Sequence, residues 1–85
     1  MKKPETILKE YVGRLSEENL RYLTCRLEQR LGPDMAEALD FLASNSEVDK
    51  WLKSAESCDD LYDMVDQIQA AVNKELQRKE SRSSA

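Results

Sequence analysis

The chain has 85 residues and a formal net charge of −4, with 40% hydrophobic and 35% charged residues, which suits one small domain. Helix-forming Leu, Ala, Glu, Lys and Arg are abundant while glycine and proline each occur twice, and this argues against a β-rich fold. The acidic balance argues against a nucleic-acid partner, because phosphate contacts supply most of the affinity of such proteins.

The first two expected helices cover residues 4–14 and 17–31. Pro4 suits the first turn of the first helix, and Ser16 can cap the second. The apolar stripe of the first helix consists of Ile7, Leu8, Tyr11, Val12 and Leu15. The seam of the second consists of Leu20, Leu23, Leu27 and Leu31. The Gly-Pro pair at 32–33 predicts that the second helix stops there.

A third helix is expected to begin at Pro33 and to end before the polar run 44–46, and Ser46 is expected to cap a short fourth helix. The stripe of the third helix consists of Met35, Ala38, Leu39 and Leu42. The stripe of the fourth consists of Val48, Trp51, Leu52 and Ala55. We expect the large side chains of Phe41 and Trp51 to anchor the core.

The last helix is expected over residues 58–78, after a cap in which Ser57 is followed by Asp60. Its broad apolar stripe consists of Leu61, Met64, Val65, Ile68, Ala71, Val72 and Leu76. Residues 79–85 lack apolar side chains until the final alanine, and we expect a disordered tail there. The sequence therefore predicts a single helical domain over residues 1–78. Its fold class is all-α, a compact bundle of four to five short amphipathic helices with a longer C-terminal helix.

Candidate residues for catalysis or metal binding are few. Histidine is absent, which removes the commonest general acid–base group and metal ligand. Asp59, Asp63 and Asp66 share a helical face but lack the ligand pattern of a calcium loop, so we expect a solvated acidic surface. Cys25 and Cys58 lack a C-x-x-C spacing, and we expect buried, reduced thiols. We therefore expect no enzyme, no cofactor and no metal.

The charge distribution along the chain is uneven. The net charge is +2 over residues 1–31, −8 over residues 32–73 and +2 over residues 74–85. Such a dipolar surface favours docking to charged partners, although charge runs also serve simply as solvated surface. The sequence shows no apolar run typical of a secretory signal or a membrane span, so we expect a cytoplasmic protein without membrane contact.

One face of the helix at 17–31 is the candidate partner-binding surface. On the side away from the leucine seam the helix carries Tyr22, Cys25, Arg26 and Arg30. Tyrosine and arginine are enriched where protein partners bind most strongly. Two accounts compete for this face. Either the helix is central and contacts other helices on both sides, or the face meets a partner chain.

A second candidate surface lies on the helix at 58–78. Its seam of Leu61, Val65, Ile68, Val72 and Leu76 approaches a coiled-coil spacing. An uncovered end at Val72 and Leu76 would favour antiparallel pairing with a second copy, whereas packing on the first two helices would bury it. We expect a non-enzymatic protein–protein interaction module, an adaptor or small regulatory subunit, whose partner is another protein chain or a second copy. The alternative is a structural homodimer assembled through helix 58–78 or helix 17–31.

Overall fold

Five α-helices make up the part of the chain that this computed structural model describes, residues 3–29 and 32–83. They are α1 (Pro4–Gly13), α2 (Glu17–Gln29), α3 (Gly32–Leu42), α4 (Ser46–Lys53) and α5 (Cys58–Ser83). The described residues contain no strand. The expected all-α bundle with a longer C-terminal helix is confirmed.

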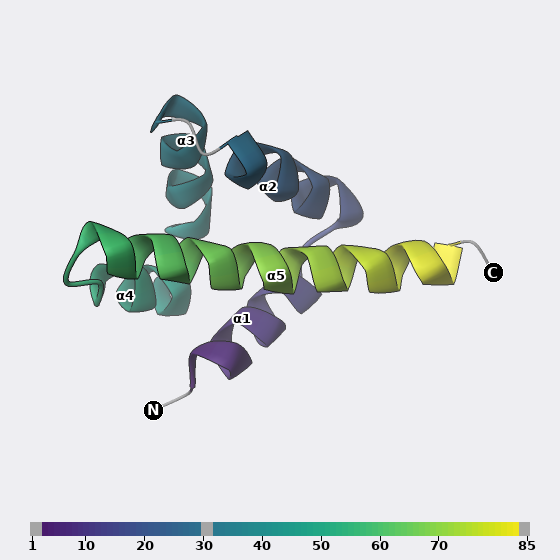
Figure 1. Cartoon of the computed structure of the whole chain (residues 1–85). Helices are drawn as coiled ribbons and strands as arrows, with labels where there is room; N and C mark the ends of the chain where they lie inside the picture. Colours follow the sequence, from purple (N-terminus) through teal and green to yellow (C-terminus); the bar gives the residue numbers. More distant parts are fainter. Residues whose placement is uncertain (1–2, 30–31, 84–85) are drawn as a thin grey trace.

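The helices gather around α5, which runs across the whole molecule (Figure 1). At about 1.5 Å per residue the helix is about 39 Å long, close to the 43 Å long dimension of the protein. α2 packs on one side of α5 and also contacts α3, whereas α1 crosses α5 and contacts α4. α5 therefore joins two helical pairs that have little contact with each other.

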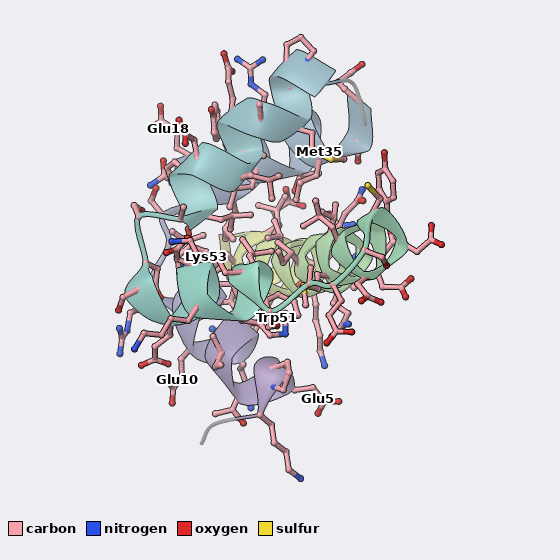
Figure 2. The ribbon with its side chains drawn as sticks, turned by 90° about the vertical axis from the view of Figure 1, so that its left-hand side faces the viewer. Glu5, Glu10, Glu18, Met35, Trp51 and Lys53 are labelled. Atoms are coloured by element: carbon pink, nitrogen blue, oxygen red, sulfur yellow. The ribbon has the colours of Figure 1, made fainter. Side chains whose placement is uncertain are left out.

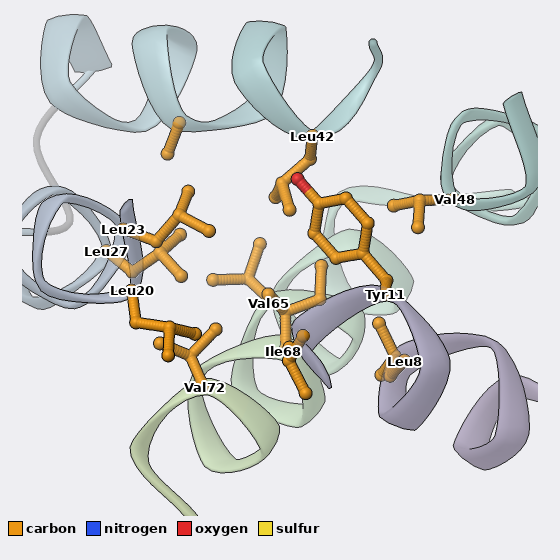
Figure 3. Close-up of a cluster of buried hydrophobic side chains, with 12 residues drawn as sticks. Leu8, Tyr11, Leu20, Leu23, Leu27, Leu42, Val48, Val65, Ile68 and Val72 are labelled. Carbon is orange, nitrogen blue, oxygen red and sulfur yellow. The ribbon is translucent and has the colours of Figure 1, made fainter. Parts of the chain in front are cut away.

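The core lies where these helices meet, and Val65, Ile68 and Val72 of α5 are fully buried within it (Figure 3). The other buried apolar residues are Leu8, Tyr11, Val12, Leu20, Leu23, Leu27, Ala38, Leu42 and Val48. Phe41 and Trp51, which we expected to anchor the core, pack against it. Both are half-buried at its edge, Trp51 where α4 meets α1 (Figure 2), because aliphatic side chains already fill the interior.

The helix caps follow the sequence with one exception. The Ser16 hydroxyl accepts a hydrogen bond from the Asn19 amide at 3.2 Å, and Ser57 accepts one from Asp60 at 3.2 Å. The prediction that Ser46 caps α4 was wrong. The side-chain oxygen of Asn45 accepts hydrogen bonds from the amides of Glu47 and Val48, which makes Ser46 the first helical residue.

α5 continues to Ser83 and does not end near residue 78. Residues 79–83, expected in a disordered tail, are helical, because the helix finds polar partners on the rest of the protein. Lys79 Nζ donates a hydrogen bond of 2.7 Å to the carbonyl of Leu15 in the turn between α1 and α2. Arg21 of α2 forms an ion pair with Glu80 at 3.5 Å.

Tyr11 brings a hydroxyl group into the core. Its side chain is 6% exposed and belongs to the same core cluster as Leu42 (Figure 3). The oxygen forms no hydrogen bond with the described residues, and burial raises the pKa of Tyr11 to about 12.

Candidate functional site

The α2 surface predicted to bind a partner lies largely against α3. Tyr22 is half-buried, and its ring centroid is 5.5 Å from that of Phe41, with the two planes tilted by 48°. The guanidinium carbon of Arg26 lies 5.4 Å from the Tyr22 ring centroid. Tyr22 and Arg26 therefore make contacts within the chain, and α2 is in contact with helices on two sides, α3 and α5.

Arg26 also forms ion pairs with the start of α3. One of its terminal nitrogens contacts Asp34, and the other lies 3.1 Å from Glu37. The hydrogen bond to Asp34 raises the pKa of Arg26 above its ordinary value, with a further contribution from the charge of Glu37. These contacts link α2 to α3 electrostatically as well as through the aromatic pair.

The other two residues of the predicted surface are Cys25 and Arg30. Cys25 is exposed on the side of α2 opposite the buried Leu23, and Arg30 lies outside the described residues. Cys58 is exposed as well, at the first position of α5. The expectation that both cysteines are buried was therefore wrong, because neither lies on a face that another helix covers.

The apolar seam of α5 is not available to a second copy. Val65, Ile68 and Val72 are fully buried, and Leu76 packs against the same core. The end at Val72 and Leu76, which could have been uncovered, is instead covered by helices of the same chain, since both α1 and α2 contact α5. Any pairing of two copies through α5 has to use the solvent-exposed side of this helix.

A groove with a volume of about 950 Å³ lies between α1 and the second half of α5. Its apolar floor is formed by Leu8 and Val12 of α1 and Ala71 of α5, with Ala70 at the rim. The groove follows α5 from Gln67 to Ser81, about 21 Å at 1.5 Å per residue. That length corresponds to about four turns of a docked helix.

The charged side chains of the groove are mainly basic. They are Glu5 and Lys9 from α1 and Lys74, Glu75 and Arg78 from α5. Glu75 is only 9% exposed and pairs with Arg78, and this hydrogen bond raises the pKa of Arg78. Lys9 and Lys74 are exposed and form no ion pair with any residue that the structure describes. The groove therefore offers a positively charged rim beside an apolar floor.

Asp59 and Asp63 are exposed on the solvent side of α5, near the start of the helix. Within residues 3–29 and 32–83, no three acidic or cysteine side chains come close enough together to hold a metal ion. The carboxylates of Asp59 and Asp63 form an exposed acidic surface near the start of α5, whereas Lys74 and Arg78 lie toward the other end of the helix.

Comparisons with known proteins do not assign the chain to a family: no family model matches it, and no curated protein or solved structure does so either. No helix in the described part of the chain combines the length and the apolar character needed to cross a bilayer. The function is therefore argued from the surface of the chain itself.

The groove has only a weak signal in the sequence. The periodicity placed Lys9, Ala70, Lys74 and Arg78 on polar helix faces, which ordinarily face solvent. One usable signal was present, because Ala70, Lys74 and Arg78 follow a spacing of four residues that combines a small side chain with two basic ones. The crossing of α1 over α5, which turns this face into a groove, has no local sequence signal.

Proposed function

We propose that this chain is a non-enzymatic protein–protein interaction module, an adaptor or small regulatory subunit, whose docking surface is the groove between α1 and α5. The observation that carries the proposal is a groove with an apolar lining, to which the more exposed Ala70 and Ala71 contribute, beside the basic side chains of Lys9 and Lys74. Amphipathic helices commonly dock in grooves of this kind, with apolar residues inserted and charged residues at the edge.

The charge of the groove favours an acidic helix as its occupant. Lys9 and Lys74 stand on the two helices that form the walls, whereas the charge of Arg78 is already paired with Glu75. A docked helix with carboxylates along its edges would meet these groups, whereas a basic helix would be repelled. Electrostatic matching of this type speeds association and selects against partners of the wrong charge.

Nuclear magnetic resonance titration of the isotopically labelled chain tests this directly. The probe is a synthetic helical peptide of about 16 residues built from Leu, Ala and Glu, and its control has Lys in place of every Glu. We expect the acidic peptide to shift amide signals of residues 5–13 and 67–81, and the basic peptide to leave them unchanged. Shifts confined to α2 and α3, or none with either peptide, would contradict the proposal.

A matched pair of substitutions locates the binding surface. Ala70→Glu places a carboxylate at the rim of the groove, and Ala36→Glu makes the same change at an exposed position of α3. We expect Ala70→Glu to weaken binding of the acidic peptide at least about tenfold, because like charges then face each other. Ala36→Glu should leave the affinity within about twofold, since exposed charges far from an interface act only weakly.

A cytoplasmic location is part of the proposal. Cys25 and Cys58 are both exposed, free thiols, and such groups persist most readily in a reducing compartment. Fractionation of cells that produce the tagged full chain would check this, together with thiol labelling of the recovered protein. Recovery in an exported fraction with oxidised cysteines would contradict it.

A further inference from the structure

The outer face of α5 carries a symmetric pattern of charge. Six exposed residues follow one another along this face at intervals of four, four, three, four and four, namely Asp59, Asp63, Gln67, Ala70, Lys74 and Arg78. Residues three and four apart share one side of a helix. The face is therefore acidic over its first half, where the exposed Asp66 lies beside it, and basic toward its end.

An antiparallel copy of the same helix is complementary to this pattern. A two-fold axis at the midpoint between Gln67 and Ala70 places Asp63 of one copy opposite Lys74 of the other. The same axis places Asp59 opposite Arg78. Each pair occurs twice, because a two-fold interface is self-complementary. The small side chain of Ala70 at the centre allows the helices to approach closely.

We propose that the occupant of the α1–α5 groove is the α5 helix of a second copy, which runs antiparallel and forms a two-fold dimer. This inference rests on the proposed function, since it uses the same groove. The groove follows α5 from Gln67 to Ser81, so the acidic start of the second copy's α5 lies beside Lys74 and Arg78. Lys9 of α1 stands on the opposite wall and faces the same carboxylates.

The pairing differs from a dimer through the apolar seam, since that seam is buried within each chain. Its contacts are mainly ion pairs between exposed groups, which salt screens. We therefore expect a weak dimer whose dissociation constant rises at least about tenfold between about 50 mM and 500 mM salt.

A charge exchange tests both the partner and the register. In the Asp63→Lys variant, both facing pairs of the dimer consist of two lysines, which repel each other. In the Lys74→Asp variant, both facing pairs consist of two aspartates, which also repel each other. Each single variant should be monomeric in sedimentation velocity under conditions in which the wild type dimerises. An equimolar mixture of the two should form a heterodimer, because in the proposed register both of its facing pairs then join a lysine to an aspartate. The double variant, in which the two charges are exchanged, should regain the homodimer.

Two controls separate loss of pairing from loss of fold. Circular dichroism should show unchanged helix content in each variant, because Asp63 and Lys74 are exposed. Glu18→Lys makes a comparable charge change at an exposed position of α2 and should leave the dimer within about twofold of the wild-type affinity.

The outcomes distinguish this inference from the proposed function. A wild-type chain that stays monomeric up to about 1 mM at low salt would overturn the second copy as occupant, although the groove could still bind the acidic peptide. A dimer that tolerates both single charge changes would overturn the antiparallel register. A chain that neither dimerises nor binds the peptide would overturn both proposals.

Discussion

The rings of Tyr22 and Phe41 lie 5.5 Å apart between centroids and join α2 to α3. Arg26 extends the same contact, because its guanidinium lies over Tyr22 and pairs with Asp34. α3 contacts α2 more extensively than any other helix. These side chains therefore hold α3 on α2 together with Ala38 and Leu42, which α3 buries in the core.

Replacement of Tyr22 by alanine should destabilise the fold. We expect Tyr22→Ala to lower the free energy of unfolding by about 1–3 kcal/mol, since it removes a half-buried ring and an aromatic pair. Urea unfolding followed by circular dichroism measures the change. Tyr22→Phe is the matched control and should keep most of the stability, and a double-mutant cycle with Phe41→Ala should show coupling. Additive effects in that cycle would contradict the pairing.

Because Tyr11 is buried, we expect the free energy of unfolding to fall at high pH. Burial raises the pKa of Tyr11 to about 12, whereas an unfolded tyrosine ionises near pH 10. Between these values the unfolded chain loses the proton while the folded chain keeps it, so the free energy of unfolding decreases as the pH rises. Urea unfolding at a series of pH values from about 9 to 12 measures the slope.

Tyr11→Phe is the control for this slope. At neutral pH the substitution should be neutral or stabilise the protein by up to about 1 kcal/mol, because it removes a buried hydroxyl that has no partner among the described residues. The part of the high-pH decrease that comes from Tyr11 should disappear in this variant. A neutral-pH loss above about 1 kcal/mol would show instead that the hydroxyl makes a stabilising contact.

The N-terminal cap of α4 predicts different effects for substitutions of the adjacent residues Asn45 and Ser46. Asn45→Ala should lower the free energy of unfolding by about 1 kcal/mol, because the amides of Glu47 and Val48 lose their acceptor. Ser46→Ala should change it by less than about 0.5 kcal/mol, since Ser46 is exposed within the first turn. Thermal and urea unfolding of both variants would check this, and the reverse order would restore Ser46 as the cap.

Lys79 holds the late part of α5 on the body of the protein. Lys79→Met should cost about 0.5–1.5 kcal/mol and speed amide exchange near residues 79–83, because the Leu15 carbonyl loses its donor. Lys50→Met is the matched control, since Lys50 is an exposed lysine of α4, away from the groove. Hydrogen-exchange mass spectrometry reports both variants. Equal exchange in the two would contradict the role of Lys79.

Exposure of both cysteines predicts their reactivity. Cys25 and Cys58 should react with a thiol reagent such as Ellman's reagent in the folded protein, without denaturant. Cys25→Ser and Cys58→Ser should each remove one equivalent of the fast reaction. Reaction only after unfolding would place the thiols inside the protein.

Much of the fold could be predicted from spacing alone. Leu20, Leu23 and Leu27 recur on one face of α2 and are fully buried, as are Val65 and Ile68 of α5. Periodicity predicts these faces because a short amphipathic helix gains most of its stability from burial of its apolar side. The caps were harder, since Asn45 and Ser46 are adjacent residues that both suit the position.

The candidate site depended on tertiary arrangement and could not be predicted in the same way. A helical pattern gives the two faces of α2 but not the helix that covers each, so Tyr22 could equally have met a partner. The helical continuation of α5 to Ser83 required the carbonyl of Leu15, which is distant in the sequence. The groove forms because α1 crosses α5, and the sequence of neither helix by itself predicts that crossing.

The position of α5 in the chain has a consequence for synthesis. Val65, Ile68 and Val72 lie at the centre of the core, yet they belong to α5, which is synthesised after the four helices that it covers. Until then the leucines of α2 and the apolar side of α1 lack their main cover, and a nascent chain exposes them. Stalled chains that end before α5 should accordingly bind chaperones and be digested rapidly by protease, with protection gained only when translation reaches the end of that helix.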